Sequence, residues 1–275
     1  MTKRRETLAR IADALERLAP PVVPPQDWLS APAYVWDGTS ARPVETLDAL
    51  PLATLRGVDE QKEAFAQYVA RLATGAAAHD TLLWGARGMG KSALVRAGVA
   101  DAQATHGDGA LALVQISAAA LGKVSDLLSQ LAHVDRSFLL FVDDLGFGAD
   151  QKSEMLSIRS LLDGGVTPRP PAVRVVVTSN RRAIVERDAH RTEALHERDA
   201  RDDALALADR FGLKLGFHPC DRATYLEIVR AYAGPLGLSF DEEEAMAFAI
   251  ARGNRSGRTA YQFATELAGR AGLSL

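Results

Sequence analysis

Cysteine is almost absent from this sequence, since Cys220 is the only one among 275 residues. No internal disulfide can form, which is typical of proteins from a reducing compartment. Long apolar runs are missing too. None approaches the roughly 20 residues of a transmembrane helix, and the charged N-terminal stretch lacks the apolar core of a secretion signal. We therefore expect a soluble, cytoplasmic protein with no membrane partner.

An excess of either charge is also lacking. The chain has 32 basic and 35 acidic residues, which give a formal net charge of -3. Such a protein has no overall positive field to attract nucleic acid, although this count does not exclude a local basic patch. The length, with 47% hydrophobic residues, is ample for a buried core. One domain with an appendage, or two modest domains, are the natural organisations.

Short apolar runs alternate with helical stretches from residue 81 to residue 217. The runs are "TLLW", "ALALVQIS", "SFLLFVDD", "AVRVVVTSN" and "LKLGF". This alternation predicts a parallel sheet of five strands with helices on both faces. After Pro219, three helical segments follow without a strand signal. We predict an α/β fold with a five-stranded parallel sheet and a small C-terminal helical lid, and we expect residues 28–52 to be irregular.

The stretch "LLWGARGMGKSALVRAG" contains the spacing G-x-x-x-x-G-K-S. A chain of this length matches that spacing by chance about once in 100, so the context matters. The motif lies between an apolar strand and an amphipathic helix, as a phosphate-binding loop requires. In such a loop Lys91 reaches the β- and γ-phosphates and Ser92 binds Mg²⁺. The predicted contacts are Gly85, Ala86, Arg87, Gly88, Met89, Gly90, Lys91, Ser92 and Ala93. The alternative is a strand–turn–helix junction with an incidental lysine.

Carboxylate and amide side chains follow two further buried strands. Asp143 and Asp144 come directly after "FLLFV", and Asn180 ends "VRVVVTSN". Beside a phosphate loop, Asp143 is the candidate Mg²⁺ ligand and Asp144 the candidate group that polarises an attacking water. The amide of Asn180 can hydrogen-bond the γ-phosphate or that water. The alternatives are a turn-forming Asp-Asp pair and an ordinary turn asparagine.

These three strand ends together resemble the AAA+ family of P-loop ATPases, over residues 55–273. The resemblance implies ATP and Mg²⁺ as ligands and a homo-oligomer, either a ring or a head-to-tail assembly. It also implies roles for further residues: Gly57 and Val58 in "LRGVDEQKEAF" at the adenine, Asn180 as first sensor, Arg210 in "LADRFG" as arginine finger, and Arg258 in "RSGRTAYQF" as second sensor. Arg255 is the alternative second sensor. A simple contact with a helix C-terminus is the alternative for Arg210.

Three other phrases resemble a narrower bacterial group of stand-alone AAA+ ATPases that is catalogued as a family of unknown function. They are "LLDGGVTPRP", "TSNRR" and "ADRFGLKLGFHPCDRATYLEIV". This resemblance implies nothing about biological role. The mixed-charge segment 181–210, which leads to the implied finger, predicts a solvated helix, with a subunit contact as the alternative.

The chain also departs from the wider family. The stretch "SAAALGKVSDLL" has no aromatic pore loop, which argues against polypeptide threading. Residues 117–137 have room for one helix, whereas replication initiators and helicase loaders carry an extra one there. Asp144 stands where glutamate is common, which shortens the presumed base by one methylene and would slow hydrolysis.

The sequence therefore predicts an ATPase that remodels an unknown protein or nucleic-acid client. We divide the chain into an N-terminal helix with a proline-rich extension (1–54), the nucleotide-binding domain (55–219) and the helical lid domain (220–275). Two alternatives belong to other classes. One is a binding module that holds ATP with little turnover and docks a partner through residues 1–54. The other is a small-molecule kinase, which would not need Asn180, Arg210 and Arg258.

Overall fold

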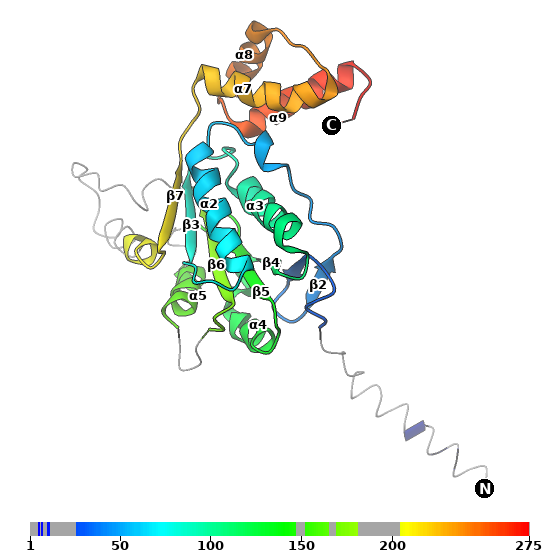
Figure 1. Ribbon diagram of the computed structural model, residues 1–275, viewed down its shortest axis with the longest axis vertical. Helices are drawn as coiled ribbons and strands as arrows, with labels where there is room; N and C mark the ends of the chain where they lie inside the picture. The colour runs from blue at the N-terminus through cyan, green and yellow to red at the C-terminus, as the bar shows by residue number, and fades with distance from the viewer. Residues whose placement is uncertain are drawn as a thin grey trace.

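The computed structural model describes residues 5, 7, 10, 11, 26–146, 152–164, 169–180 and 204–274. Its centre is a seven-stranded sheet of order β2-β1-β4-β5-β6-β3-β7 (Figure 1). Every neighbouring pair is parallel except β1 and β2. The strands are β1 Ala33–Trp36, β2 Ala41–Val44, β3 Thr81–Gly85, β4 Leu111–Ile116, β5 Ser137–Val142, β6 Val173–Ser179 and β7 Leu213–Phe217.

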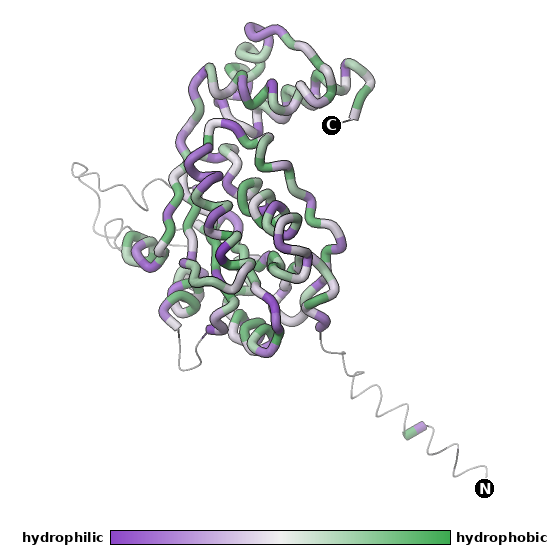
Figure 2. Tube along the Cα trace, viewed as in Figure 1, coloured by the Kyte–Doolittle hydropathy of each residue, from purple (hydrophilic) through white to green (hydrophobic). Residues whose placement is uncertain are grey.

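The central strands are apolar along their whole length because helices cover both faces of the sheet. Every residue of β3 and β5 is buried, as continuous apolar runs in a parallel sheet predict. Helices α2 Asp59–Ala73 and α3 Lys91–His106 contribute to the core on one face. Helices α4 Val124–Leu131 and α5 Lys152–Asp163 contribute on the other face. Green apolar and purple polar segments alternate along the helices that cover the sheet (Figure 2).

The expectation of an irregular stretch at 28–52 is wrong, because residues 33–36 and 41–44 form strands, and the sheet gains two strands beyond the predicted five. The runs "AYVW" and "ARPV" are four residues long and lie beside or contain proline, so they lack an ordinary strand signal. Parallel pairing of β1 with β4 stabilises them. Pro43 is tolerated because β2 is an edge strand. The predicted domain boundary at residue 54 stays a prediction, and strands from both sides of it belong to one sheet.

A buried arginine fixes this N-terminal segment to the sheet. The side chain of Arg136, just before β5, donates hydrogen bonds to the carbonyls of Trp28 (3.0 Å), Ala31 (2.8 Å), Asp108 and Leu111 (3.1 Å). Arg136 is only 5% exposed, and burial lowers its pKa. These carbonyl contacts compensate for much of the cost of removing the charge from water. One side chain thus joins the chain before β1 to the start of β4.

The predicted C-terminal lid is present as α7 Arg222–Ala233, α8 Glu242–Ala251 and α9 Gly257–Arg270. It lies beyond the end of the sheet at which β3 stops (Figure 1). The side chain of Asp221 caps α7 by accepting from the Thr224 N–H at 2.8 Å. The acidic first turn of α8 is tied to the other two helices by ion pairs Arg222–Glu243, Arg230–Glu242 and Arg270–Glu244.

Two predicted segments lie largely outside the described residues. In the region of the predicted N-terminal helix, residues 5, 7, 10 and 11 are described, and they are helical. Most of the mixed-charge segment 181–210 is outside as well, although residues 204–208 are helical. Among the described residues, no helix combines the length and apolar character that a membrane crossing requires.

We predict that Arg136→Met lowers the free energy of unfolding by about 3 kcal/mol, since four carbonyls lose this guanidinium as donor and only the Leu111 carbonyl is also bonded by the Gln103 side chain among these side-chain contacts. Urea denaturation monitored by circular dichroism measures this change. Arg42→Met, on the exposed edge strand β2, is the matched control and should stay within about 0.5 kcal/mol of wild type. Equal losses in the two variants would contradict the anchoring role of Arg136.

Candidate active site

A cavity of about 810 Å³ lies at the carboxyl ends of the strands, between the sheet and the lid. Open α/β sheets bind ligands at this end of their strands. Five cationic side chains and three carboxylates line the cavity, so it carries a surplus of positive charge that favours an anionic ligand. They are Arg56, Arg87, Lys91, Arg96 and Arg258, with Asp48, Asp143 and Asp144.

The glycine-rich segment forms a tight loop between β3 and α3, as its spacing predicts. Gly85 has a φ of 119°, and a Cβ there would lie 2.1 Å from the carbonyl oxygen of Phe217 on β7. Gly88 has a φ of 73°, and a Cβ there would lie 2.9 Å from the Ser256 hydroxyl of the lid. Only glycine allows both approaches. Helix α3 then begins at Lys91, so its free N–H groups face the cavity and favour an anion.

Lys91 connects this loop to the end of β6. Its Nζ donates to the carbonyls of Gly85 (3.0 Å) and Ala86 (2.8 Å) and to Oδ1 of Asn180 (2.9 Å). The residue is only 6% exposed. Burial lowers the pKa of Lys91 to about 8, although the nearby carboxylates of Asp144 and Asp143 oppose this shift. A polyanion in the cavity would restore the charged ammonium to an ordinary pKa.

Oxygen atoms that suit a magnesium ion meet beside Lys91. The Ser92 hydroxyl donates to Oδ1 of Asp143 at 2.6 Å, and the Thr178 hydroxyl donates to the same oxygen at 2.6 Å. Hydroxyl and carboxylate oxygens are the ligands that Mg²⁺ prefers. The predicted metal pair, Ser92 and Asp143, is therefore brought together and fits the ion. Thr178 was missed, although a polar residue in the valine run of β6 was an available signal.

Asp144 is the one non-glycine residue with a positive φ, 54°, in the part of the chain that the structure describes. Such strain persists where the surroundings over-determine the backbone. Here the Asp144 N–H donates to the Thr178 hydroxyl at 2.8 Å, and the side-chain amide of Asn180 donates to the Asp144 carboxylate. Asp144, Asn180 and Lys91 thus form one hydrogen-bonded chain across the ends of β5, β6 and β3.

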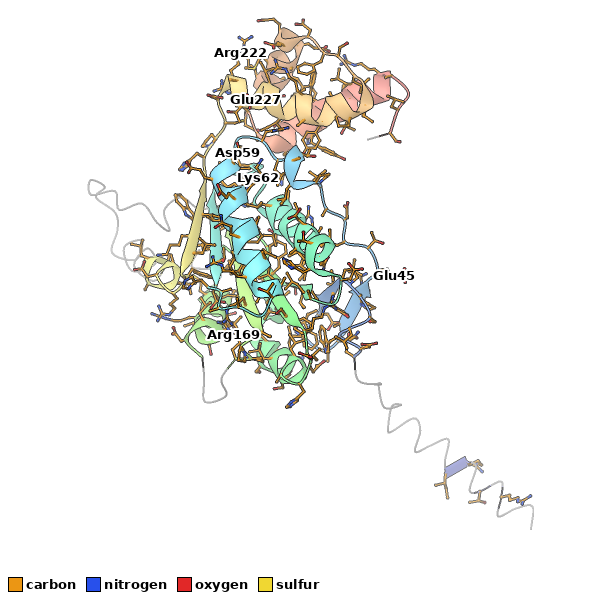
Figure 3. All side chains as sticks on the ribbon, in the orientation of Figure 1. Glu45, Asp59, Lys62, Arg169, Arg222 and Glu227 are labelled. Atoms are coloured by element: carbon orange, nitrogen blue, oxygen red, sulfur yellow. The ribbon has the colours of Figure 1, made fainter. Side chains whose placement is uncertain are left out.

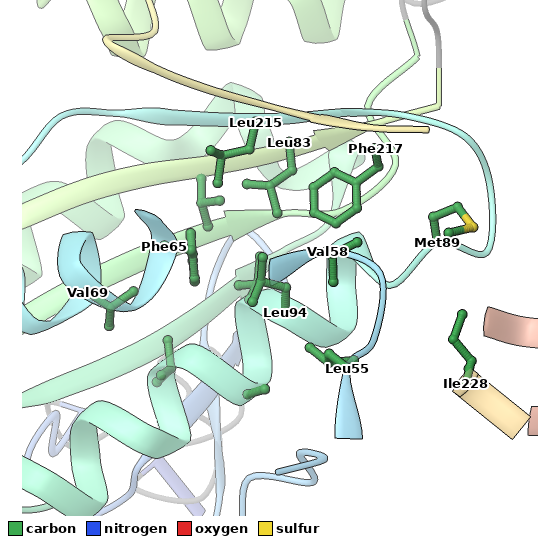
Figure 4. Close-up of a cluster of buried hydrophobic side chains, with 14 of the residues drawn as sticks. Leu55, Val58, Phe65, Val69, Leu83, Met89, Leu94, Leu215, Phe217 and Ile228 are labelled. Carbon is green, nitrogen blue, oxygen red and sulfur yellow. The ribbon is translucent and has the colours of Figure 1, made fainter. Parts of the chain in front are cut away.

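One part of the cavity wall is apolar. Leu55 and Val58 come from the segment before α2, and Ile228 faces them from α7 (Figure 4). The rings of Tyr232 and Tyr261, on α7 and α9, pack edge to face at 5.3 Å, and both line the cavity. The three lid residues were missed, because apolar and aromatic side chains on lid helices have the same pattern as core residues.

Not every predicted contact residue lines this cavity. Gly85 and Ala86 turn their carbonyls to Lys91 instead. Gly57 packs against α7, where a Cβ would lie 2.2 Å from Cγ2 of Thr224. Of the two candidate sensor arginines, Arg258 lines the cavity and Arg255 is not among its lining residues. The Arg258 N–H also donates to the carbonyl of Gly88 at 3.1 Å.

Arg210 lies apart from the other predicted site residues. It precedes β7, at the end of the sheet farthest from the lid, where Arg169 is also placed (Figure 3). Its guanidinium pairs with Asp163 and donates to the carbonyl of Ala206. The second contact, near the end of helical residues 204–208, is the one that the helix-terminus alternative expects. Arg210 lines a separate cavity of about 570 Å³, and a role in catalysis requires a neighbouring subunit.

A family model described as "Protein of unknown function (DUF815)" matches residues 29–271. The chain belongs to the DUF815 family. The match spans both the sheet and the lid, and it includes β1 and β2. No curated protein matches the chain significantly.

Solved structures place this DUF815 protein in the AAA+ fold of P-loop ATPases, as the sequence resemblance predicted. The Thermotoga maritima RuvB Holliday junction branch migration motor is 17% identical, with a TM-score of 0.52 over 81% of this chain and 66% of that chain. The chain thus spans slightly less than two thirds of RuvB. The Aeropyrum pernix ORC1 protein, solved in complex with DNA, is 17% identical, with a TM-score of 0.55 over 79% and 61%. The FIGL-1 AAA domain, solved with ADP, is 16% identical, with a TM-score of 0.52 over 82% and 75%.

We predict a distinctive pH dependence from Lys91. Its pKa falls from 10.5 to about 8 on folding, so between these values the unfolded chain binds more protons. The free energy of unfolding of wild type should therefore rise with pH across this window relative to Lys91→Met, by at most about 1.4 kcal/mol per pH unit. Urea denaturation of both proteins at pH 7, 8, 9 and 10 measures the difference. A difference independent of pH would contradict the lowered pKa of Lys91.

Proposed function

We propose that this DUF815 protein binds ATP with Mg²⁺ and hydrolyses it to ADP and phosphate. The observation that carries the proposal is the junction of two polar networks at the glycine loop. One joins Ser92, Asp143 and Thr178, and the other joins Lys91, Asn180 and Asp144. The first has the donors of a magnesium site, and the second places a cation, an amide and a carboxylate together.

In this proposal the γ-phosphate lies between Lys91 and the N-terminus of α3. Ser92 and Asp143 hold Mg²⁺, which would neutralise charge on the phosphate oxygens. Asp144 and Asn180 orient a water molecule. The water oxygen bonds to the γ-phosphorus while the bond to the bridging oxygen of ADP breaks, and the water proton passes to Asp144 or to the phosphate. Lys91 stabilises the charge that develops.

An ATP-dependent binding module with little turnover is the second candidate. Two observations favour slow chemistry: aspartate, which is shorter than glutamate, stands at position 144, and its carboxylate is already hydrogen-bonded by Asn180. In either case we propose a cytoplasmic homo-oligomer that acts on a protein or nucleic-acid client. The similarity to RuvB and to ORC1, which was solved with DNA, suggests DNA as the client. The net charge of -3, in contrast, provides no general attraction to DNA.

We predict that Asp144→Asn binds ATP with Mg²⁺ within about threefold of wild type but hydrolyses it at least about 100-fold more slowly. The amide keeps the shape of the side chain and loses its basicity. Isothermal titration calorimetry and a steady-state phosphate-release assay measure the two effects. Asp101→Asn, on the exposed face of α3, is the control and should match wild type. Full turnover in Asp144→Asn would remove Asp144 from the mechanism, and unchanged ATP affinity in Lys91→Ala would remove the phosphate-loop assignment.

We also propose that Arg210 acts on the nucleotide of a neighbouring subunit. Arg210 does not line the nucleotide cavity of its own chain. It can therefore reach a γ-phosphate only if subunits meet head to tail, and such contacts close into rings or extend as filaments. Asp163 would have to release Arg210 when the interface forms, because it pairs with the same guanidinium in the single chain.

For Arg210→Ala we predict nearly unchanged ATP binding and a loss of hydrolysis of roughly 1000-fold. Activity per subunit in wild type should rise with protein concentration. Mixing the Arg210→Ala and Lys91→Ala variants should restore part of the hydrolysis. The intact nucleotide site of the first variant can then meet the intact Arg210 of the second. Arg222→Ala, in an exposed ion pair of the lid (Figure 3), is the control. Constant activity on dilution, with a silent Arg210→Ala, would favour the helix-terminus role.

A further inference from the structure

Arg87 is a cation of the glycine loop that has no role in the proposed mechanism. It lines the nucleotide cavity, and its side chain is exposed. Within the described part of the chain, no carboxylate pairs with its guanidinium and no protein acceptor holds it. Arg210, in contrast, pairs with Asp163 and has to leave that partner before it can meet a phosphate. Arg87 can therefore bind an anion without breaking an existing contact.

The main chain places Arg87 at the start of the part of the loop that can hold a phosphate. One residue earlier, the N–H of Ala86 donates to the carbonyl of Phe217 at 2.7 Å. The N–H of Arg87 has no such carbonyl partner among the residues that the structure describes. The next residue, Gly88, has a φ of 73°, and turns of this kind direct successive N–H groups toward an anion. A phosphate bound by the loop thus lies beside the residue from which the Arg87 side chain extends.

Two other cations of the cavity lie close to Arg87. The carbonyl of Gly88 accepts the Arg258 N–H at 3.1 Å, and a Cβ on Gly88 would lie 3.2 Å from Cβ of Arg258. Burial is the main cause of the lowered pKa of Lys91, and the charges of Arg87 and Arg258 add to it. Three like charges around one loop repel one another, and a bound anion of several charges removes this repulsion. A γ-phosphate beside Lys91 would lie in the field that Arg87 already exerts there.

We propose that Arg87 is a catalytic residue, whose guanidinium donates hydrogen bonds to oxygens of the γ-phosphoryl group of the nucleotide bound by its own subunit. In hydrolysis the bond from the γ-phosphorus to the bridging oxygen breaks, its electron pair stays on ADP, and the water oxygen bonds to phosphorus. Charge spread over the phosphoryl oxygens matches a fork of guanidinium N–H groups. Other phosphoryl-transfer enzymes also take such an arginine from the same chain. This inference rests on the proposed binding and hydrolysis of ATP.

The full-length Arg87→Gln variant tests this role, because glutamine removes the charge and the fork. The variant should bind ATP with Mg²⁺ within about threefold of wild type, hydrolyse it about 100-fold more slowly, and bind ADP with aluminium fluoride about 100-fold more weakly. Aluminium fluoride stands in for the transferred phosphoryl group, so this affinity reports the contact even where turnover is slow. Isothermal titration calorimetry and a phosphate-release assay measure these effects. Arg71→Gln, on the exposed face of α2 and outside the cavity wall, is the matched control and should behave as wild type.

Mixing variants separates this role from the one proposed for Arg210. Arg87 and Lys91 serve the same nucleotide, so mixing the Arg87→Gln and Lys91→Ala variants should restore no hydrolysis. Restored hydrolysis would show that Arg87 acts on the nucleotide of a neighbouring subunit, and it would overturn the proposed action within one subunit.

The remaining outcomes separate the role of Arg87 from ATP binding. If wild type does not bind ATP, the proposed function itself fails. If wild type binds ATP and Arg87→Gln keeps full affinity for ADP with aluminium fluoride, ATP binding stands and the role of Arg87 is wrong. Equal losses of affinity for ATP and for the analogue would make Arg87 a binding residue only. If Arg96→Gln, which changes another arginine of the cavity wall, causes the same loss, overall charge is responsible and the direct contact is overturned. Thermal denaturation of each variant checks that it is folded.

Discussion

The site depends on one buried ammonium. Lys91 begins α3, and its Nζ is held by the end of β3 and by Asn180 at the end of β6. A charge removed from water must find partners nearby, or the group loses its proton. The carbonyls at the β3 end and the amide oxygen of Asn180 supply them. Because β3 and β6 are neighbouring parallel strands, their carboxyl ends place these partners around a single point.

Sequence reasoning located this point because each component has a local pattern. The glycine spacing marks the loop, and carboxylates directly after an apolar run mark the end of β5. The five predicted strands lie in one sheet because parallel strands buried on both faces have long apolar runs. Strands β1 and β2 escaped prediction, since a four-residue run beside a proline carries almost no signal. Their stability comes from the pairing of β1 with β4 and from Arg136, 100 residues later in the chain than Trp36.

The apolar wall of the cavity was beyond the reach of sequence reasoning for a different reason. Ile228, Tyr232 and Tyr261 are at helical positions that a lid core would also require, and only the docking of α7 and α9 over the loop turns them toward a ligand. Asp48 is similar: one acidic residue in a proline-flanked connection has no pattern of its own. Arg210 shows the opposite limit. A local phrase singled it out, but the role proposed for it would depend on a second chain.

The contact between loop and lid has a mechanical consequence. The carbonyl of Gly88 accepts the Arg258 N–H, and Gly88 lies against Ser256 at the start of α9. With 14 residues, α9 is roughly 21 Å long. If the loop shifts so that α9 turns by about 10° around its first residues, the far end of the helix moves by roughly 4 Å. The ion pairs among the lid helices would carry α8 along. A small shift of the glycine loop would thus move the outer surface of the lid by a larger distance.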